Sequence, residues 1–207
     1  MDNPFHKLNI VERKRILDSA FKVFTDTPYE KASTNQIVKD AGISKGKLFY
    51  YFNSKSNLFD YLVSYGLTYI KTHYIDQLHL STKDFIQRYK DFALIKSNAY
   101  EKESHLFAFM SYVYLHESKR LSNENLSLIE SYQNYQNEHL KKNIDTSLFR
   151  EDIASDRVIE LLEYSLDGYQ NSLVSKFKRL NIKKESMTKH YKEFENFLLI
   201  LKKIYYK

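Results

Sequence analysis

Apolar residues recur at helical spacing along almost the whole chain. Near the N-terminus, one face of a predicted helix carries Ile16, Leu17, Ala20, Phe21 and Phe24. Asn9 followed by Glu12 marks the start of this helix, because a capping side chain and an acidic third position both favour helix initiation. Thr27-Pro28 marks its end, because proline cannot continue a helix.

Two short helices follow, and a tight turn joins them. Ser33 and Gln36 form a capping box for the first, which Gly42 ends, since glycine tolerates the left-handed geometry of a helix terminus. Ser44 then caps the second short helix directly, and Asn53-Ser54 ends it and begins a fourth helix. Two short helices joined by a glycine-containing turn predict a helix-turn-helix.

The second short helix carries more polar groups than packing alone requires. Leu48 and Phe52, four residues apart, can both point inward. The remaining positions include two cations and two phenols, at Lys45, Lys47, Tyr50 and Tyr51. These four cannot all be buried, so we expect an outer face of cations and phenols.

The chain beyond residue 54 is predicted to be nearly continuous helix. We expect helices at about 54–78, 82–98, 103–116, 122–143, 155–180 and 185–205. The apolar segment 107–115 could form a strand by its alternation, but its helical neighbours favour a central buried helix. The predicted fold is all-α with about nine helices, a helix-turn-helix domain at 1–53 and a helical bundle domain at 54–207.

The last two predicted helices have unusually broad apolar faces. One narrower apolar face is enough to pack a helix into the core of its own subunit, so the additional apolar surface predicts a subunit interface. The residues expected at this interface are Val158, Leu162, Tyr169, Leu173, Tyr191, Phe194, Leu198 and Leu201.

Composition narrows the function classes. Four glycines and two prolines in 207 residues argue against a turn-rich β fold, and the absence of cysteine excludes disulfides and thiolate metal sites. Residues 1–55 carry 10 Lys/Arg against 6 Asp/Glu, which favours a polyanionic partner. No apolar run reaches the ~20 residues that span a bilayer, and no signal peptide is evident, so we expect a cytoplasmic protein without membrane contact.

The stretch 16–62 resembles the N-terminal domain of the TetR family of bacterial regulators. The matching residues are Ile16-Leu17, Ala20, Phe24, Tyr29, Ser33-Thr34, Ile37, Ala41-Gly42-Ile43-Ser44-Lys45-Gly46, Leu48-Phe49-Tyr50-Tyr51-Phe52, Ser54-Lys55 and Leu58. The chain departs from the family pattern at Pro28, where glycine is usual, at Lys47, where a small polar residue is common, and at Phe49, where tyrosine is usual.

The resemblance implies a set of DNA-contacting residues: Thr34, Ser44, Lys45, Gly46, Lys47, Phe49, Tyr50, Tyr51 and Lys55. Thr34 and Lys55 would bind phosphates, and the backbone at Gly46 could approach DNA closely. Lys47 is the candidate base reader, since lysine can donate to O6 and N7 of guanine.

The resemblance further implies a homodimeric repressor that binds a palindromic double-stranded DNA operator. Phenols among the aromatic residues of the middle helices predict a pocket for a small apolar or aromatic effector, because buried hydroxyl groups need partners. The candidate lining residues are Tyr65, Tyr69, Phe92, Phe107, Met110, Tyr132 and Tyr164.

Two alternatives stay open at this point. In the first, a protein partner and not a small molecule controls the DNA-binding regulator. In the second, the chain is an enzyme or a small-molecule carrier. No catalytic constellation, phosphate-binding glycine loop or histidine spacing typical of a metal site supports the second alternative, so we expect no catalytic residues, no metal and no cofactor.

Overall fold

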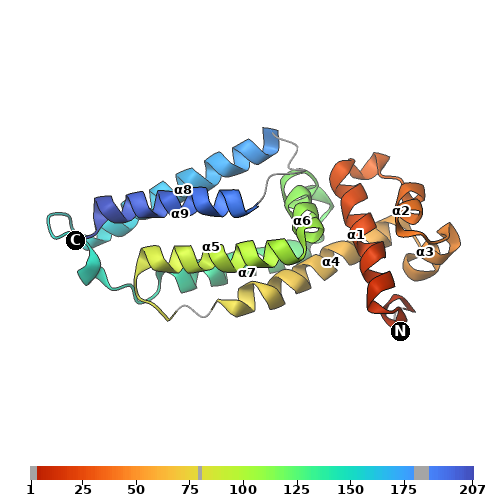
Figure 1. Cartoon of the computed structure of the whole chain (residues 1–207), viewed down its shortest axis with the longest axis horizontal. Helices are drawn as coiled ribbons and strands as arrows, with labels where there is room; N and C mark the ends of the chain where they lie inside the picture. The colour runs from red at the N-terminus through yellow and green to blue at the C-terminus, as the bar shows by residue number, and fades with distance from the viewer. Residues whose placement is uncertain (1–3, 79–80, 180–186) are drawn as a thin grey trace. The chain divides into compact units, whose positions relative to one another are not determined.

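The computed structural model describes residues 4–78, 81–179 and 187–207 and is shown in Figure 1. These residues form α-helices, short 3-10 turns and one isolated bridge between Phe149 and Tyr206, with no strand among them. The all-α prediction is therefore confirmed. By their internal contacts the residues form two units, Met1–Lys71 with Lys102–Glu130 (unit 1), and Thr72–Glu101 with Ser131–Lys207 (unit 2). The sequence-based division at residue 53 stays a prediction.

The helices lie close to their predicted positions. Those that lie wholly or mostly in unit 1 are α1 (Ile10–Asp26), α2 (Thr34–Ala41), α3 (Lys45–Phe52), α4 (Lys55–His73) and α6 (Ser104–His116), with 3-10 turns η1 (Pro4–Lys7), η2 (Tyr29–Lys31) and η4 (Ser118–Arg120). The others are α5 (Phe85–Lys102), α7 (Asn123–Lys141), α8 (Ser155–Arg179) and α9 (Met187–Tyr205), with η3 (Ile75–Gln77) and η5 (Thr146–Leu148). None of the described helices is long and apolar enough to cross a membrane.

The predicted starts of the first three helices and the predicted end of α2 are confirmed, whereas α4 ends five residues before its predicted end. The side chains of Asn9, Ser33 and Ser44 each accept a hydrogen bond from the backbone N–H three residues later, at 2.9, 3.4 and 3.1 Å. Gly42 ends α2 with φ +63°, a backbone conformation that favours glycine. Local sequence therefore defines where α1, α2 and α3 begin and where the turn of the helix-turn-helix lies.

Aromatic rings form the core of unit 1. Phe109 of α6 lies 5.3 Å from Phe21 of α1 and 5.5 Å from Phe59 of α4 between ring centroids. All three are almost fully buried. The predicted central helix 107–115 is therefore a helix that packs on α1 and α4, although Tyr114 on its far side is half exposed.

The core of unit 2 joins α5, α8 and α9. It contains Phe85, Ile86, Phe149, Val158, Leu162, Leu166, Leu198 and Leu201. Four of these, Val158, Leu162, Leu198 and Leu201, were expected at a subunit interface, but none is more than 4% exposed within a single chain. A partner subunit could not bury them further. The reason is that α8 and α9 use these stripes to form their own core with α5.

Other residues of α8 and α9 remain open to solvent. Tyr169 stacks on Phe197 with ring centroids 4.7 Å apart, and it is half-buried, as are Leu173, Tyr191 and Phe194. Among the residues of these helices whose side chains the structure describes, the exposed apolar ones are Leu161, Tyr164, Leu199, Ile200 and Ile204. The surplus apolar surface predicted for α8 and α9 therefore exists, but it is formed by residues next to the buried ones and not by the buried residues themselves.

Candidate DNA-binding surface

The helix-turn-helix is held together by a small set of buried side chains. Ile37 and Ala41 of α2 and Leu48 and Phe52 of α3 are nearly inaccessible to solvent. The Ser19 hydroxyl of α1 donates a 2.9 Å hydrogen bond to the carbonyl of Ile37, in a buried position. Because α2 and α3 bury their apolar faces in this way, their polar positions are left at the surface.

The outer face of α3 presents a cation, a phenol and open backbone. Lys45, Gly46 and Tyr50 are exposed, and Tyr50 retains 67% of its accessible surface. At Gly46 the nearest atom to an added Cβ would be the Ser44 hydroxyl oxygen at 4.0 Å, so the backbone there is uncovered. Thr34, the first residue of α2, and Phe49 are partly buried. In helix-turn-helix proteins, residues near the N-terminus of the second helix contact base edges in the major groove.

The two adjacent phenols of α3 differ in environment. Tyr51 is only 8% exposed, and its ring lies 5.6 Å from that of Phe5 and 6.2 Å from that of Phe52. Tyr50 points to solvent. Of the two tyrosines that the sequence could not distinguish, Tyr50 is thus the accessible one, and the Tyr51 ring belongs to the core.

Lys47 is paired with an acidic residue of α1. Its ammonium group donates to the carboxylate of Glu12, 35 residues away in sequence. This hydrogen bond raises the pKa of Lys47 above its usual value. Sequence analysis identified Glu12 only as part of a helix start, since nothing in the local pattern indicates its contact with α3.

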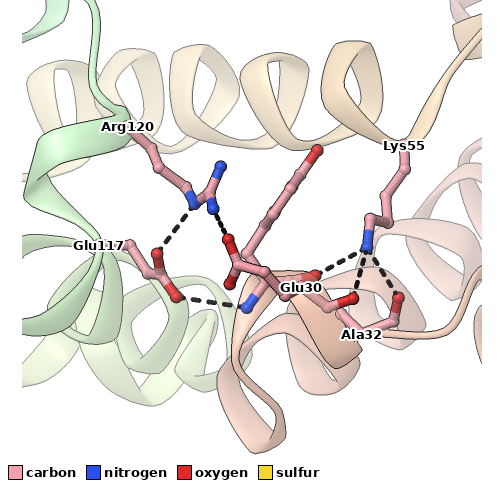
Figure 2. A network of polar contacts seen from close by, with 6 residues as sticks. Glu30, Ala32, Lys55, Glu117 and Arg120 are labelled. Carbon is pink, nitrogen blue, oxygen red and sulfur yellow. Dashed lines mark hydrogen bonds and ion pairs between the residues drawn. The ribbon is translucent and has the colours of Figure 1, made fainter.

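Lys55 is bound to the turn that precedes α2, as Figure 2 shows. Its ammonium group donates to the carbonyl oxygens of Tyr29, Glu30 and Ala32 at 2.7, 3.2 and 3.2 Å. It also lies 4.6 Å from the centroid of the Tyr29 ring. An ammonium group has three N–H donors, and here three backbone acceptors surround them. The expected phosphate contact of Lys55 stays a prediction, and it would have to compete with these carbonyls.

A second cation reaches the same turn from η4. Arg120 lies 4.1 Å from the centroid of the Tyr29 ring and forms ion pairs with Glu30 and Glu117. The Glu117 carboxylate accepts a 3.2 Å hydrogen bond from the backbone N–H of Tyr29. The turn η2, which precedes the helix-turn-helix, is therefore tied both to the start of α4 and to the segment after α6.

Four of the residues predicted to line an effector pocket lie in unit 1. Phe107 and Met110 of α6 are buried, and the Tyr69 ring contacts that of Phe107 edge-on at 6.2 Å. Tyr65 is half-buried, and burial is the main cause that raises its pKa. An added Cβ at Gly66 would lie 2.4 Å from the sulfur of Met110, so the absence of a side chain at Gly66 makes room for Met110.

The other three predicted pocket residues lie in unit 2, and their environments differ. Phe92 is buried against Tyr74, with ring centroids 5.2 Å apart. Tyr132 is half-buried. Tyr164 is 65% exposed, and its hydroxyl donates to the Glu160 carboxylate at 2.9 Å. Tyr164 thus belongs with the exposed apolar stripe of α8 and not with buried aromatic residues.

An open hollow lies on unit 1 and is lined by Val11, Lys14, Arg15, Asp18, Ser19, Lys22, Asp40 and His105. It contains none of the residues predicted to bind an effector. In the part of the chain that the structure describes, no three His, Asp or Glu side chains lie close enough together to hold a metal ion.

Comparisons with known proteins agree with this geometry. Residues 16–62 match the family described as bacterial regulatory proteins, tetR family. An HTH-type transcriptional regulator of Staphylococcus aureus strain USA300 is 37% identical over 62 residues, which cover 30% of this chain and 34% of that relative. The sequence match therefore covers only about a third of the curated relative.

Solved structures are similar over most of the chain. A TetR family transcriptional regulator from Chloroflexus aurantiacus J-10-FL has a TM-score of 0.63 at 19% identity, covering 98% of this chain and 97% of that one. The transcriptional regulator FadR from Bacillus subtilis, in complex with stearoyl-CoA, has a TM-score of 0.52 at 13% identity, covering 89% of this chain and 96% of that one. At these identities the similarity concerns the fold.

Proposed function

We propose that this chain is a transcriptional regulator of the TetR family that binds a palindromic DNA operator as a homodimer, since residues 16–62 match that family. The observation that carries the proposal is the outer face of α3. There Lys45 and Tyr50 are exposed beside the uncovered backbone of Gly46, at the start of the second helix of a helix-turn-helix. In such motifs the second helix enters the major groove.

Selection of binding sites from fragmented genomic DNA tests this function. We expect enrichment of a palindrome whose half-sites lie about 34 Å apart along the duplex, or a multiple of that spacing. Lys47→Ala should relax preference at one base pair per half-site, because a good base contact discriminates by about 1–3 kcal/mol. Failure of the full chain to enrich any sequence over random fragments would contradict the proposal.

The proposed dimer uses the outer faces of α8 and α9. Leu161 and Tyr164 on α8 and Ile200 and Ile204 on α9 are exposed at helical spacing, so they form continuous apolar stripes. A stable interface buries about 800 Å² per partner, and obligate dimers often bury more. Sedimentation of the full chain should give the mass of a dimer, and a monomer at micromolar concentration would contradict this arrangement.

We further propose that a small apolar or aromatic effector releases the operator. The support is the group of phenols in half-buried positions, such as Tyr65 and Tyr69, and the similarity in fold to a regulator that was crystallised with stearoyl-CoA. An effector that prefers the DNA-free state should weaken operator binding about 5–150-fold, and operator should weaken effector binding by the same factor.

Paired titrations of candidate effectors with and without operator test this control. Fatty acyl-CoA thioesters and aromatic acids are suitable first ligands. Equal ligand affinities with and without operator would mean that a bound ligand does not control DNA binding. That result would favour control by a protein partner.

A further inference from the structure

The contact between Glu12 and Lys47 places a negative charge on the side of the helix-turn-helix that carries its cations. Glu12 lies in the first turn of α1, and Lys47 lies in the first turn of α3. Their side chains are 22% and 39% exposed, so water only partly screens the pair. A carboxylate at this place opposes the approach of phosphates, and general attraction to DNA therefore cannot account for it.

Lys47 is restrained at both ends. Its backbone N–H donates to the Ser44 hydroxyl at 3.1 Å, and its ammonium group donates to the Glu12 carboxylate. A free lysine is a flexible point charge with many rotamers, and it can follow any nearby phosphate. A lysine held by a carboxylate loses much of this freedom, because leaving the carboxylate costs a charge-assisted hydrogen bond.

We propose that Glu12 is a specificity-determining positioning residue, which holds the Lys47 ammonium group in place for a matching base and away from phosphates. The inference rests on the proposed function. On unrelated DNA, Lys47 can reach a phosphate only by giving up its contact with Glu12, and the freed Glu12 carboxylate then repels the DNA backbone. On operator DNA, a guanine edge offers acceptors to the N–H groups of Lys47 that do not point at Glu12. Glu12 thus lowers affinity for unrelated DNA more than affinity for operator.

Glu12→Gln tests this role, with Asp40→Asn as the matched control. Asp40 lies near the end of α2, and its carboxylate accepts a hydrogen bond from the Gln36 side chain at 2.6 Å and not from a lysine of α3. Both variants remove one negative charge. Only Glu12→Gln removes the charged partner of Lys47.

The measurement is the ratio of operator affinity to affinity for unrelated DNA of the same length. For Glu12→Gln we expect tighter binding to unrelated DNA and a ratio that falls about 3- to 10-fold, part of the discrimination that one base contact supplies. For Asp40→Asn both affinities should rise by the same factor, which leaves the ratio unchanged. In a Lys47→Met background, Glu12→Gln should no longer change the ratio.

A measurement without DNA tests the contact itself. In the free protein, NMR signals of the Lys47 ammonium group should show slowed hydrogen exchange that Glu12→Gln abolishes. Identical exchange in both proteins would overturn the proposal. So would an unchanged affinity ratio for Glu12→Gln in a chain that prefers its operator. A wild-type chain with no preference for any sequence would instead overturn the proposed function, and the role of Glu12 with it.

Discussion

Lys55 has one role by the family resemblance and another in the structure, and a single substitution can separate the two. The resemblance implies a phosphate contact, whereas the structure places the ammonium group among three carbonyl oxygens of the turn before α2. Lys55→Met keeps the length of the apolar stem and removes only the charged donor. The variant therefore separates the two roles.

The expected loss of stability follows from the contacts. Hydrogen bonds from a charged group contribute about 1.5–3 kcal/mol net. The ammonium group of Lys55 also lies 4.6 Å from the centroid of the Tyr29 ring, and a cation–ring pair in contact with water adds about 0.5–1 kcal/mol. In Lys55→Met some of the three carbonyl oxygens can accept from water instead, so we expect the free energy of unfolding to fall by about 2–3 kcal/mol. For a chain of this length the midpoint of thermal unfolding should fall by about 5–10 °C.

Thermal and urea unfolding of the free protein provide the assay, and Lys31→Met is the control. Lys31 is an exposed lysine of the same turn, so its substitution removes equal charge. A Lys55→Met protein whose stability matches the control within about 0.5 kcal/mol would refute the structural role. If such a protein also bound DNA more weakly, with a salt slope reduced by about 1, Lys55 would be a phosphate contact.

Ile200→Glu should give a folded monomer by sedimentation, because the Ile200 side chain is 55% exposed in a single chain. Leu198→Glu should instead unfold the chain, because a charge at a position that is 1% exposed has no partner. A dimeric Ile200→Glu protein would contradict the proposed interface. Gly42→Ala should destabilise the chain by about 1–2 kcal/mol in urea unfolding, since φ there is +63°, and unchanged stability would contradict the turn geometry. Burial raises the pKa of Asp84, but the hydrogen bond from Lys202 at 2.8 Å and others outweigh burial and lower it. The pKa of Asp84 in the folded state is thus below the unfolded value of about 3.9. The stabilisation from ionised Asp84 is therefore complete above that value and is lost as the pH falls further. The free energy of unfolding of Asp84→Asn should fall less than that of wild type between about pH 5 and pH 2, and identical pH profiles would contradict this prediction.

Sequence patterns predicted the helices well because the signals that define helix ends are local. The capping side chains Asn9, Ser33 and Ser44 bond to backbone three residues away, so the chain carries the whole interaction within one turn. Gly42 acts through its own backbone angle. Such features depend little on the rest of the fold.

The division of α8 and α9 between core and surface could not be predicted in the same way. Leu198 and Ile200 are both apolar and lie two residues apart, and the helical periodicity of the sequence places both on a broad apolar face. Which of them is buried depends on where α5 packs, because the core that includes Leu198 also contains Phe85 and Ile86. That information is absent from the pattern of either helix.

The three lysines assigned to DNA from the sequence illustrate the same limit at the candidate site. The resemblance assigns all three lysines to DNA, with Lys47 on a base and Lys55 on a phosphate, but contacts within the protein give the three different partners. Lys45 is exposed, with its ammonium group 5.9 Å from the Phe49 ring centroid; Lys47 is paired with Glu12, and Lys55 is bound to backbone carbonyls. A cation that must exchange an existing partner for a phosphate gains less from doing so than one that exchanges only water. Lys45 should therefore contribute most of the three to the salt dependence of DNA binding, and Lys55 least.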